Sequence, residues 1–367
     1  MRRYLKFIVL LLLTGALLWW FARGVDDWGS VRAEVGASNW PLVALGVAFV
    51  CSTYFVRALR WRVLLAPLAP EASLWSLFGA TTVGFGSIFL LGRAGEFVRP
   101  AFLPLADRRV RPAASFVTIG VERIYDMSAV VVLFAFNLIW FSAGGGDAAV
   151  YAQVRQAGFL LLAAAVAGIA CLILFRTRAG QIVNWLDARL ERSPSPLVKR
   201  VGKFVTHLLE QLGRALSVLT DARVLAVTIG QTALLWGLIA VANWCVLRAF
   251  GLPFGAADTI FVLGWALVGS LVPTPGGAAG AFHVATARGL AFLGVAAAKA
   301  TAVSIVLHLV VFGPALFLGL FFFLRSDVKL SGLRDVAGRE ADDVRGDETD
   351  EQGGYVSGGK RRATITP

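Results

Sequence analysis

The chain has 367 residues, of which 57% are hydrophobic and only 16% are charged. Soluble domains average about 25% charged residues, and the apolar residues here form long blocks rather than the stripes of amphipathic helices. The net charge of +12 is shared by nucleic-acid-binding proteins, but the chain carries no nucleic-acid-binding motif, and cytoplasmic loops of membrane proteins have the same basic excess. The composition argues against a water-soluble protein and predicts an all-α, polytopic transmembrane bundle.

Six segments are long and apolar enough to cross a hydrocarbon core of about 30 Å. The first follows basic residues, as in a signal peptide, but it has no small-residue cleavage site and ends in aromatic residues, so we interpret it as a retained span. The six cover about 7–22, 40–58, 113–141, 156–175, 224–249 and 298–324.

Two further apolar stretches, 74–91 and 258–293, are broken by glycine, proline or charge. If 74–91 crossed the membrane, the arginines that follow it would lie outside, against the positive-inside bias. We therefore predict that this stretch enters the membrane and returns to the same side. Each arm of 258–293 would span only about 22 Å, so we interpret it as a second re-entrant hairpin, although two full crossings would give the same final topology.

These segments predict one transmembrane domain over residues 1–325 with an inverted pseudo-repeat. Its halves cover about 40–141 and 224–324, and each consists of a span, a broken hairpin and another span. A short echo supports the repeat, because Gly86-Ser87-Ile88 and Gly269-Ser270-Leu271 lie at corresponding breaks. Inverted repeats with broken helices are common in secondary transporters, which bind their substrate near the midplane.

The remaining segments are polar. Residues 176–223 form a basic stretch with helical apolar periodicity, which predicts an amphipathic linker on the cytoplasmic leaflet or packed on the bundle. Residues 326–367 show no apolar periodicity and predict a disordered tail. The distribution of lysine and arginine places both termini in the cytoplasm.

Six ionisable residues lie within or beside the apolar segments of the first half. Their spacings of three and four residues place those of each element on one helix face. A charge at mid-bilayer costs at least about 2.5–3.5 kcal/mol, so we expect them to pair or to line a polar cavity, with a hairpin arginine bound to an acid of the following span. The six are Arg93, Glu96, Arg99, Glu122, Arg123 and Asp126.

Two interpretations of these charges remain open. In the first, an arginine binds a phosphate or a carboxylate couples protons, since intramembrane ionisable residues are usually functional. In the second, the residues only form ion pairs that fasten the hairpin to the span, or lie at the level of the lipid headgroups.

The second break supplies backbone groups and histidines rather than charge. Pro275-Gly276-Gly277 ends one arm and exposes the amides of the next, which favours an anion. His283 and His308 lie in facing elements, where they would titrate near neutral pH or donate to a headgroup. The alternative is that both are core histidines with satisfied hydrogen bonds.

Catalytic signatures are missing from the sequence. It has no phosphate loop, metal-ligand cluster or nucleotide-binding glycine fingerprint, so we predict no catalytic residue, metal or cofactor. Cys51, Cys171 and Cys245 each lie in an apolar run, which favours small buried side chains over disulfides.

Several short motifs occur in a recognisable order. They are Arg57-Ala58-Leu59-Arg60-Trp61-Arg62-Val63-Leu64-Leu65, Gly92-Arg93-Ala94-Gly95-Glu96 with Arg99, Glu122-Arg123 with Asp126, and Pro273-x-Pro275-Gly276-Gly277. Over residues 5–325 the chain resembles the flippase-like integral membrane family related to the transmembrane part of lysylphosphatidylglycerol synthase. The resemblance implies a role in moving or presenting lipid-linked or aminoacylated lipids across the cytoplasmic membrane, and some relatives are associated with hopanoid or polyprenyl-glycan pathways.

The chain departs from that family in two respects. Family members tend to carry a glutamate after the second break and an arginine on the last span, where this chain has His283 and His308. The tail is also too short for the soluble aminoacyl-transferase domain of lysylphosphatidylglycerol synthase. Lysyl transfer by this chain is therefore not expected.

We accordingly expect a non-enzymatic, multi-pass lipid flippase or transporter of the cytoplasmic membrane, whose partner is an anionic or lipid-linked lipid. The residues expected to bind it are the six charged groups of the first half together with Pro275, Gly276, Gly277, His283 and His308. The alternatives are a membrane-embedded glycosyltransferase acting on a polyprenyl phosphate, and a scaffold for a lipid-modifying complex.

Overall fold

The computed structural model describes residues 18–25, 27–140 and 221–326, with scattered residues between 12 and 16 and between 156 and 206. This described part is all-helical, as the composition predicts. The predicted spans 7–22 and 156–175, the linker 176–223 and the tail 326–367 lie wholly or largely outside it. The elements are α2 (Trp28–Gly36), α3 (Trp40–Leu65), α4 (Leu74–Leu91), the 3-10 helix η1 (Gly92–Phe97), α5 (Val98–Ala106), α6 (Pro112–Trp140), α9 (Ala222–Ala249), α10 (Ala256–Ser270), α11 (Pro275–Ala278), α12 (Ala281–Phe292) and α13 (Ala297–Arg325).

Several of these helices have the length and composition of membrane spans. The candidates within the described residues are the helices Trp40–Leu65, Ala222–Ala249 and Ala297–Arg325, and the longer stretch Leu74–Ala106, which takes in α4, η1 and α5. Helix α6, with 29 residues, carries three ionisable side chains and is not one of them. A helical, multi-pass membrane protein is therefore supported, whereas the six crossings and two re-entrant hairpins stay predictions.

The segment from α4 to α5 reverses direction rather than running straight. Gly92, at a φ of 60°, interrupts the helix, and η1 carries the chain around the turn. Beyond the turn, α5 packs closely along α4. At Gly84 on α4 there is no room for a Cβ, since the side chain of Arg99 on α5 occupies that position. At the open end, the backbone N–H of Ser73 donates to a carboxylate oxygen of Asp107 at 3.0 Å. The segment therefore begins and ends at the same end of the bundle.

Asp107 fixes the open end of this first hairpin. Besides Ser73, it accepts hydrogen bonds from the side chain and the backbone N–H of Arg109. The side-chain bond from Arg109 is the main reason why the pKa of the Asp107 carboxyl lies below its usual value.

Helices α10 and α12 form a second hairpin around α11. Gly269 on α10 packs against the backbone of Ala281 and Phe282, and the rings of Phe261 and Phe292 lie 5.3 Å apart. At the tip, Gly276 and Gly277 have φ angles of 77° and 64°, which favour glycine. The Pro-Gly-Gly break thus forms the turn.

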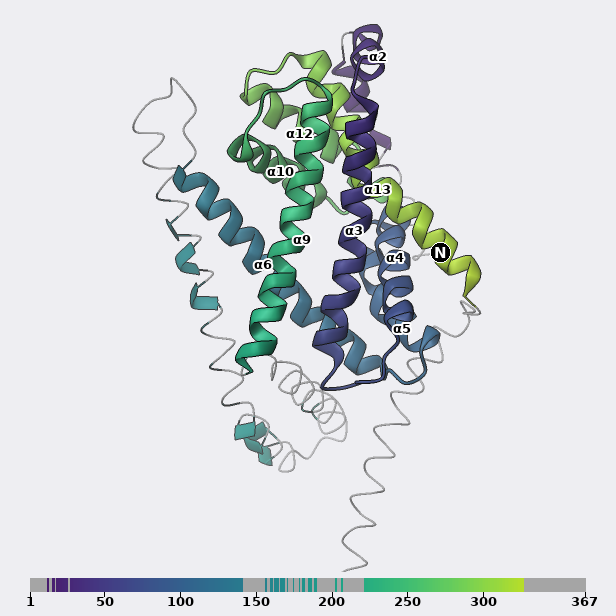
Figure 1. Cartoon of the computed structure of the whole chain (residues 1–367), viewed down its shortest axis with the longest axis vertical. Helices are drawn as coiled ribbons and strands as arrows, with labels where there is room; N and C mark the ends of the chain where they lie inside the picture. The colour runs from purple at the N-terminus through teal and green to yellow at the C-terminus, as the bar shows by residue number, and fades with distance from the viewer. Residues whose placement is uncertain are drawn as a thin grey trace, which may run out of the picture.

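The two hairpins enter the bundle from opposite ends (Figure 1). Helices α3 and α9 pack against each other and run antiparallel. The N–H of Asn39, at the start of α3, donates to the carbonyl of Ala249, at the end of α9, at 2.8 Å. The second hairpin follows α9 directly and therefore starts at that end. The first hairpin follows α3 and starts at the other end. This opposite orientation is what the predicted inverted repeat requires.

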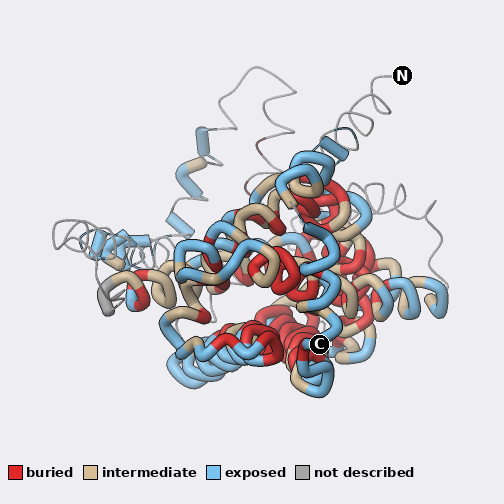
Figure 2. The backbone as a smooth tube through the Cα atoms, turned by 90° about the horizontal axis from the view of Figure 1, so that it is seen from above, coloured by how far each residue is buried: buried red, intermediate tan, exposed pale blue. Residues whose placement is uncertain are grey.

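Buried and exposed residues are distributed as expected for a bundle in lipid. Buried positions line the inner sides of the packed helices (Figure 2). Large apolar side chains also face outward, such as Leu234, Leu309 and Phe317, which are 53%, 59% and 74% exposed. Such an apolar exterior is unusual in a water-soluble monomer and suits contact with lipid tails.

Helices α4 and α13 cross at a pair of glycines, which generates a prediction about stability. A Cβ on Gly319 would lie 2.5 Å from the carbonyl oxygen of Thr82 and 3.3 Å from the Cα of Gly86. Gly319→Ala should therefore lower the free energy of unfolding by about 1–3 kcal/mol. Thermal unfolding in detergent would measure the change. Gly237→Ala on α9, where a Cβ meets nothing within 4 Å, is the matched control; equal melting temperatures would contradict the packing.

Candidate functional site

A cluster of ionised side chains lies where α3, α5 and α6 meet. Two arginines of α3 are three residues apart, and two acids of α6 are four residues apart. Each of these spacings places the two side chains on the same face of their helix. All but Arg123 are buried, and the side chain of Arg123 is 35% exposed. The cluster consists of Arg57 and Arg60 from α3, Arg99 from α5, and Glu122, Arg123 and Asp126 from α6.

Glu122 is the acid around which all four arginines of the cluster gather. Its Oε1 atom accepts a hydrogen bond from Nη1 of Arg99 at 2.6 Å and one from Nη2 of Arg123 at 3.1 Å. Nη2 of Arg60 lies 3.4 Å from the same oxygen. This carboxylate therefore ties the returning arm of the first hairpin to α6 and α3.

Asp126, one helical turn further along α6, connects to α3. Its carboxylate lies 2.8 Å from Nη1 of Arg60 and 3.2 Å from Nη1 of Arg57. It also lies 3.4 Å from Nη2 of Arg123. The pair of helices is thus joined by two adjacent acids and two arginines.

Positive charge exceeds negative charge in this cluster. Four guanidinium groups surround two carboxylates, which leaves a formal surplus of two positive charges. Several donor atoms also have no hydrogen-bond acceptor within the described residues, namely Nε and Nη2 of Arg60, Nε and Nη2 of Arg99, and Nε of Arg123. Unpaired buried charge is costly, so this surplus calls for an anion.

Aromatic rings compensate part of this cost. The guanidinium of Arg99 lies over the ring of Trp61, 4.2 Å from its centroid, and that of Arg57 lies 4.7 Å from the centroid of Phe85. Trp61 is fixed by a hydrogen bond of 3.0 Å from its Nε1 to the hydroxyl of Thr118 on α6. The arginines are therefore held in place, and their remaining donors are buried without an acceptor among the described residues.

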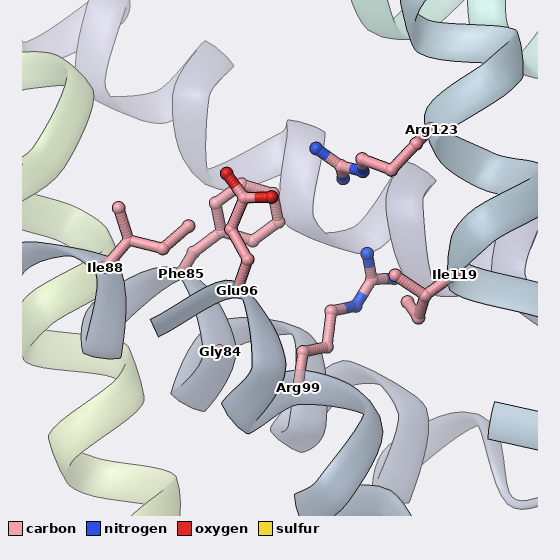
Figure 3. Close-up of a pocket in the computed structure, with 7 residues that line it drawn as sticks. All are labelled: Gly84, Phe85, Ile88, Glu96, Arg99, Ile119 and Arg123. Atoms are coloured by element: carbon pink, nitrogen blue, oxygen red, sulfur yellow. The ribbon is translucent and has the colours of Figure 1, made fainter. Parts of the chain in front are cut away.

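A small pocket opens on this cluster. Figure 3 shows Glu96, Arg99 and Arg123 reaching toward a common space, with Phe85 and Ile88 on its apolar side. The pocket is small and partly open to solvent. Of the arginines in the cluster, Arg99 and Arg123 line it directly.

The structure gathers most of the charged residues predicted from the first half. The expected ion pair between a hairpin arginine and an acid of the next span is the contact of Arg99 with Glu122. Arg93 lies apart from these acids, because its Nη1 bonds Glu96 at 2.9 Å and its Nη2 donates to the carbonyl of Ser270 at 3.2 Å. Arg93 thus connects η1 to the second hairpin.

Arg57 and Arg60 were not among the predicted site residues. In the sequence they lie at the end of the predicted span 40–58 and within the first of the family motifs. Helix α3 instead continues to Leu65 and turns both side chains inward. Their three-residue spacing, in a stretch without glycine or proline, is the signal that would have indicated a shared buried face.

The predicted residues of the second half form a separate cluster at the second break. Nε2 of His308 lies 2.9 Å from the carbonyl oxygen of Gly276 and 3.1 Å from that of Gly277. The rings of His283 and His308 are 4.7 Å apart, and Phe282 packs against both. His308 therefore satisfies the backbone carbonyls that the break exposes, and Pro275 begins the short α11 beside them.

The tips of the two hairpins touch each other. A Cβ on Gly92 would lie 3.0 Å from the carbonyl oxygen of Thr274, the residue before Pro275. Together with the bond from Arg93 to Ser270, this contact joins the two breaks, which lie far apart in the sequence.

These features define a class of protein: a multi-pass helical membrane protein with ionised side chains enclosed between its helices. The chain belongs to the family described as the lysylphosphatidylglycerol synthase TM region, which matches residues 7–319. The resemblance read from the sequence motifs is thereby confirmed.

One curated relative is similar to a large part of the chain. It is named Glycosyltransferase AglD, from Haloferax volcanii, and is 26% identical over 304 residues, which cover 77% of this chain and 49% of the relative. The chain thus spans about half the length of that relative. No solved structure matches this chain significantly.

The charge balance of the cluster generates a stability prediction. Glu122→Gln keeps the size of the side chain but removes one of two negative charges, which raises the surplus from two positive charges to three. We expect a loss of about 3–5 kcal/mol in unfolding free energy, as for other broken buried pairs. Unfolding in detergent, followed by circular dichroism, would measure it.

Glu96→Gln is the matched control. Glu96 and its partner Arg93 are 34% and 41% exposed, so solvent screens their interaction and the loss should stay below about 1 kcal/mol. If the two variants unfolded at the same temperature, the Glu122 cluster would not be the stabilising contact described above.

Proposed function

We propose that this protein is a lipid transporter of the flippase type in the cytoplasmic membrane, and that the cluster around Glu122 binds the anionic headgroup of its substrate. The observation that carries the proposal is a surplus of two positive charges, in a cluster that is buried except for Arg123, next to a pocket. Planar guanidinium groups with free donors are well suited to phosphate oxygens.

The charge surplus separates this proposal from a purely structural role. Ion pairs that only fasten a hairpin to a span are most stable when their charges balance, since each unpaired buried charge costs several kcal/mol. Here one acid, Glu122, is in contact with four arginines, and two of these, Arg99 and Arg123, line the pocket. An anion in the pocket would complete the balance.

The arrangement of the hairpins supports movement of a lipid across the membrane. In transporters with inverted repeats, broken helices place the substrate near the midplane, and the repeats move against each other. The two hairpins here start at opposite ends and touch at Gly92 and Thr274. We propose that both are re-entrant, so that the pocket is reached from alternate sides, and that both termini are cytoplasmic.

A membrane-embedded glycosyltransferase is the second candidate function. The observation that favours it is the similarity to the relative named Glycosyltransferase AglD. Because the match covers 49% of that relative, the transferase activity in its name need not reside in the shared part. Product formation from a nucleotide sugar and a polyprenyl phosphate by purified protein would favour this candidate over transport.

The re-entrant path of the first hairpin can be tested by labelling. In a cysteine-free background, Glu71→Cys and Arg108→Cys flank the hairpin at exposed positions. If the hairpin is re-entrant, a membrane-impermeant maleimide should label both from the cytoplasmic side of oriented vesicles. Ala257→Cys, at the start of α10, should be labelled from the other side. Labelling of Glu71→Cys and Arg108→Cys from opposite sides would show a full crossing.

Transport itself can be tested in proteoliposomes with a fluorescent anionic phospholipid. We expect Arg123→Gln to slow its translocation about tenfold, the effect of losing about 1.4 kcal/mol of headgroup binding. Arg123 suits this test because its side chain is 35% exposed and its removal reduces the charge surplus. Arg62→Gln, at an exposed position of α3, should transport as well as the native chain. Equal rates for all three proteins would reject the site.

A further inference from the structure

We infer that the pocket selects a lipid phosphomonoester, whose phosphate carries two negative charges, over a lipid phosphodiester, which carries one. The inference rests on the proposed function and adds the chemical class of the headgroup. Three observations carry it: the size of the charge surplus, the number of free donors in the pocket and the small volume of the pocket.

The first observation is the charge count around the pocket. The four guanidinium groups and two carboxylates of the cluster leave two positive charges without a partner among the described residues. Glu96, which also lines the pocket, adds no net charge because Arg93 pairs with it at 2.9 Å. A dianion balances this surplus, whereas a monoanion leaves one positive charge of the cluster uncompensated.

The second observation is the set of free donors on the pocket arginines. Nε and Nη2 of Arg99 and Nε of Arg123 have no hydrogen-bond acceptor among the described residues. The side chain of Arg99 is only 4% exposed, so water does not readily satisfy it. A phosphomonoester offers three terminal oxygens as strong acceptors. A phosphodiester has two, because its second ester bond uses one oxygen and adds a substituent.

The third observation is the size and lining of the pocket. The pocket is small and partly open to solvent, and its other walls are Gly84, Phe85, Ile88 and Ile119. A phosphate without a second substituent makes the smallest demand on this space, and the apolar wall suits the first carbons of a lipid chain. The additional glycerol or sugar of a phosphodiester headgroup would need more room in the same space.

The test compares two lipids with identical dioleoyl chains, phosphatidic acid as the monoester and phosphatidylglycerol as the diester. Each is titrated into the full chain in phosphatidylcholine nanodiscs, and binding is followed by native mass spectrometry. We expect phosphatidic acid to bind at least about tenfold more tightly at about pH 8, where its phosphate is fully ionised.

The pH dependence provides a second readout. The second pKa of a phosphomonoester lies at about 6, so its dianion dominates above that pH and becomes a monoanion below it. The preference for phosphatidic acid should therefore shrink as pH falls to about 5.5, while binding of phosphatidylglycerol stays constant. Arg123→Gln, which reduces the surplus to one positive charge, should reduce the preference at high pH, and Arg62→Gln should leave it unchanged.

The outcomes separate this inference from the proposed function. Equal binding of both lipids, lost in Arg123→Gln, would overturn the selectivity and leave the anionic-lipid site in place. Binding of both lipids that is insensitive to Arg123→Gln would overturn both. Inorganic phosphate serves as the third probe: if it displaced phosphatidic acid at equal concentration, the pocket would be a site for free phosphate, and the lipid assignment would fail.

Discussion

Burial of charge inside an apolar bundle is the constraint on which the rest of this structure depends. Glu122 and Asp126 bring arginines from α3 and α5 to the surface of α6, and these contacts fix where the first hairpin ends its return. Because a single unpaired charge in this environment costs several kcal/mol, the three elements cannot separate without a substitute partner or water. The ion pairs therefore determine both the packing of the first half and the chemistry of its pocket.

Glycine makes this close approach possible where helices cross or turn. Gly84 leaves room for the side chain of Arg99, and Gly86 and Gly319 bring α4 and α13 into backbone contact. At the second break, Nε2 of His308 lies within hydrogen-bond distance of two carbonyl oxygens, and one of these, that of Gly276, also accepts from the backbone N–H of Ala279. Irregular backbone inside the bundle is thus tolerated because specific side chains or other backbone segments satisfy it.

The sequence predicted the features that depend on local pattern, and less of those that depend on packing. Apolar length located α9 and α13 within a few residues, and the glycine-rich breaks located both hairpin turns. The cost of buried charge predicted the contact of Arg99 with Glu122. The sequence did not predict that Arg57 and Arg60 belong to the site, because an arginine near a helix end reaches the headgroups as readily as the interior. The packing of α3 against α6 decides which of the two environments these side chains occupy.

The two halves of the chain use the same architecture with different chemistry. In each, a residue on the returning arm of the hairpin contacts the span that follows: Arg99 with Glu122 in the first half, and His283 with His308 in the second. The first pair belongs to a cluster with surplus positive charge, whereas His308 is bound to the carbonyls of its own hairpin tip. Because His308 is already engaged with these carbonyls, the donors that we propose for an anionic headgroup lie in the first half. The two halves thus share an arrangement of hairpin and following helix but differ in the charge that it encloses.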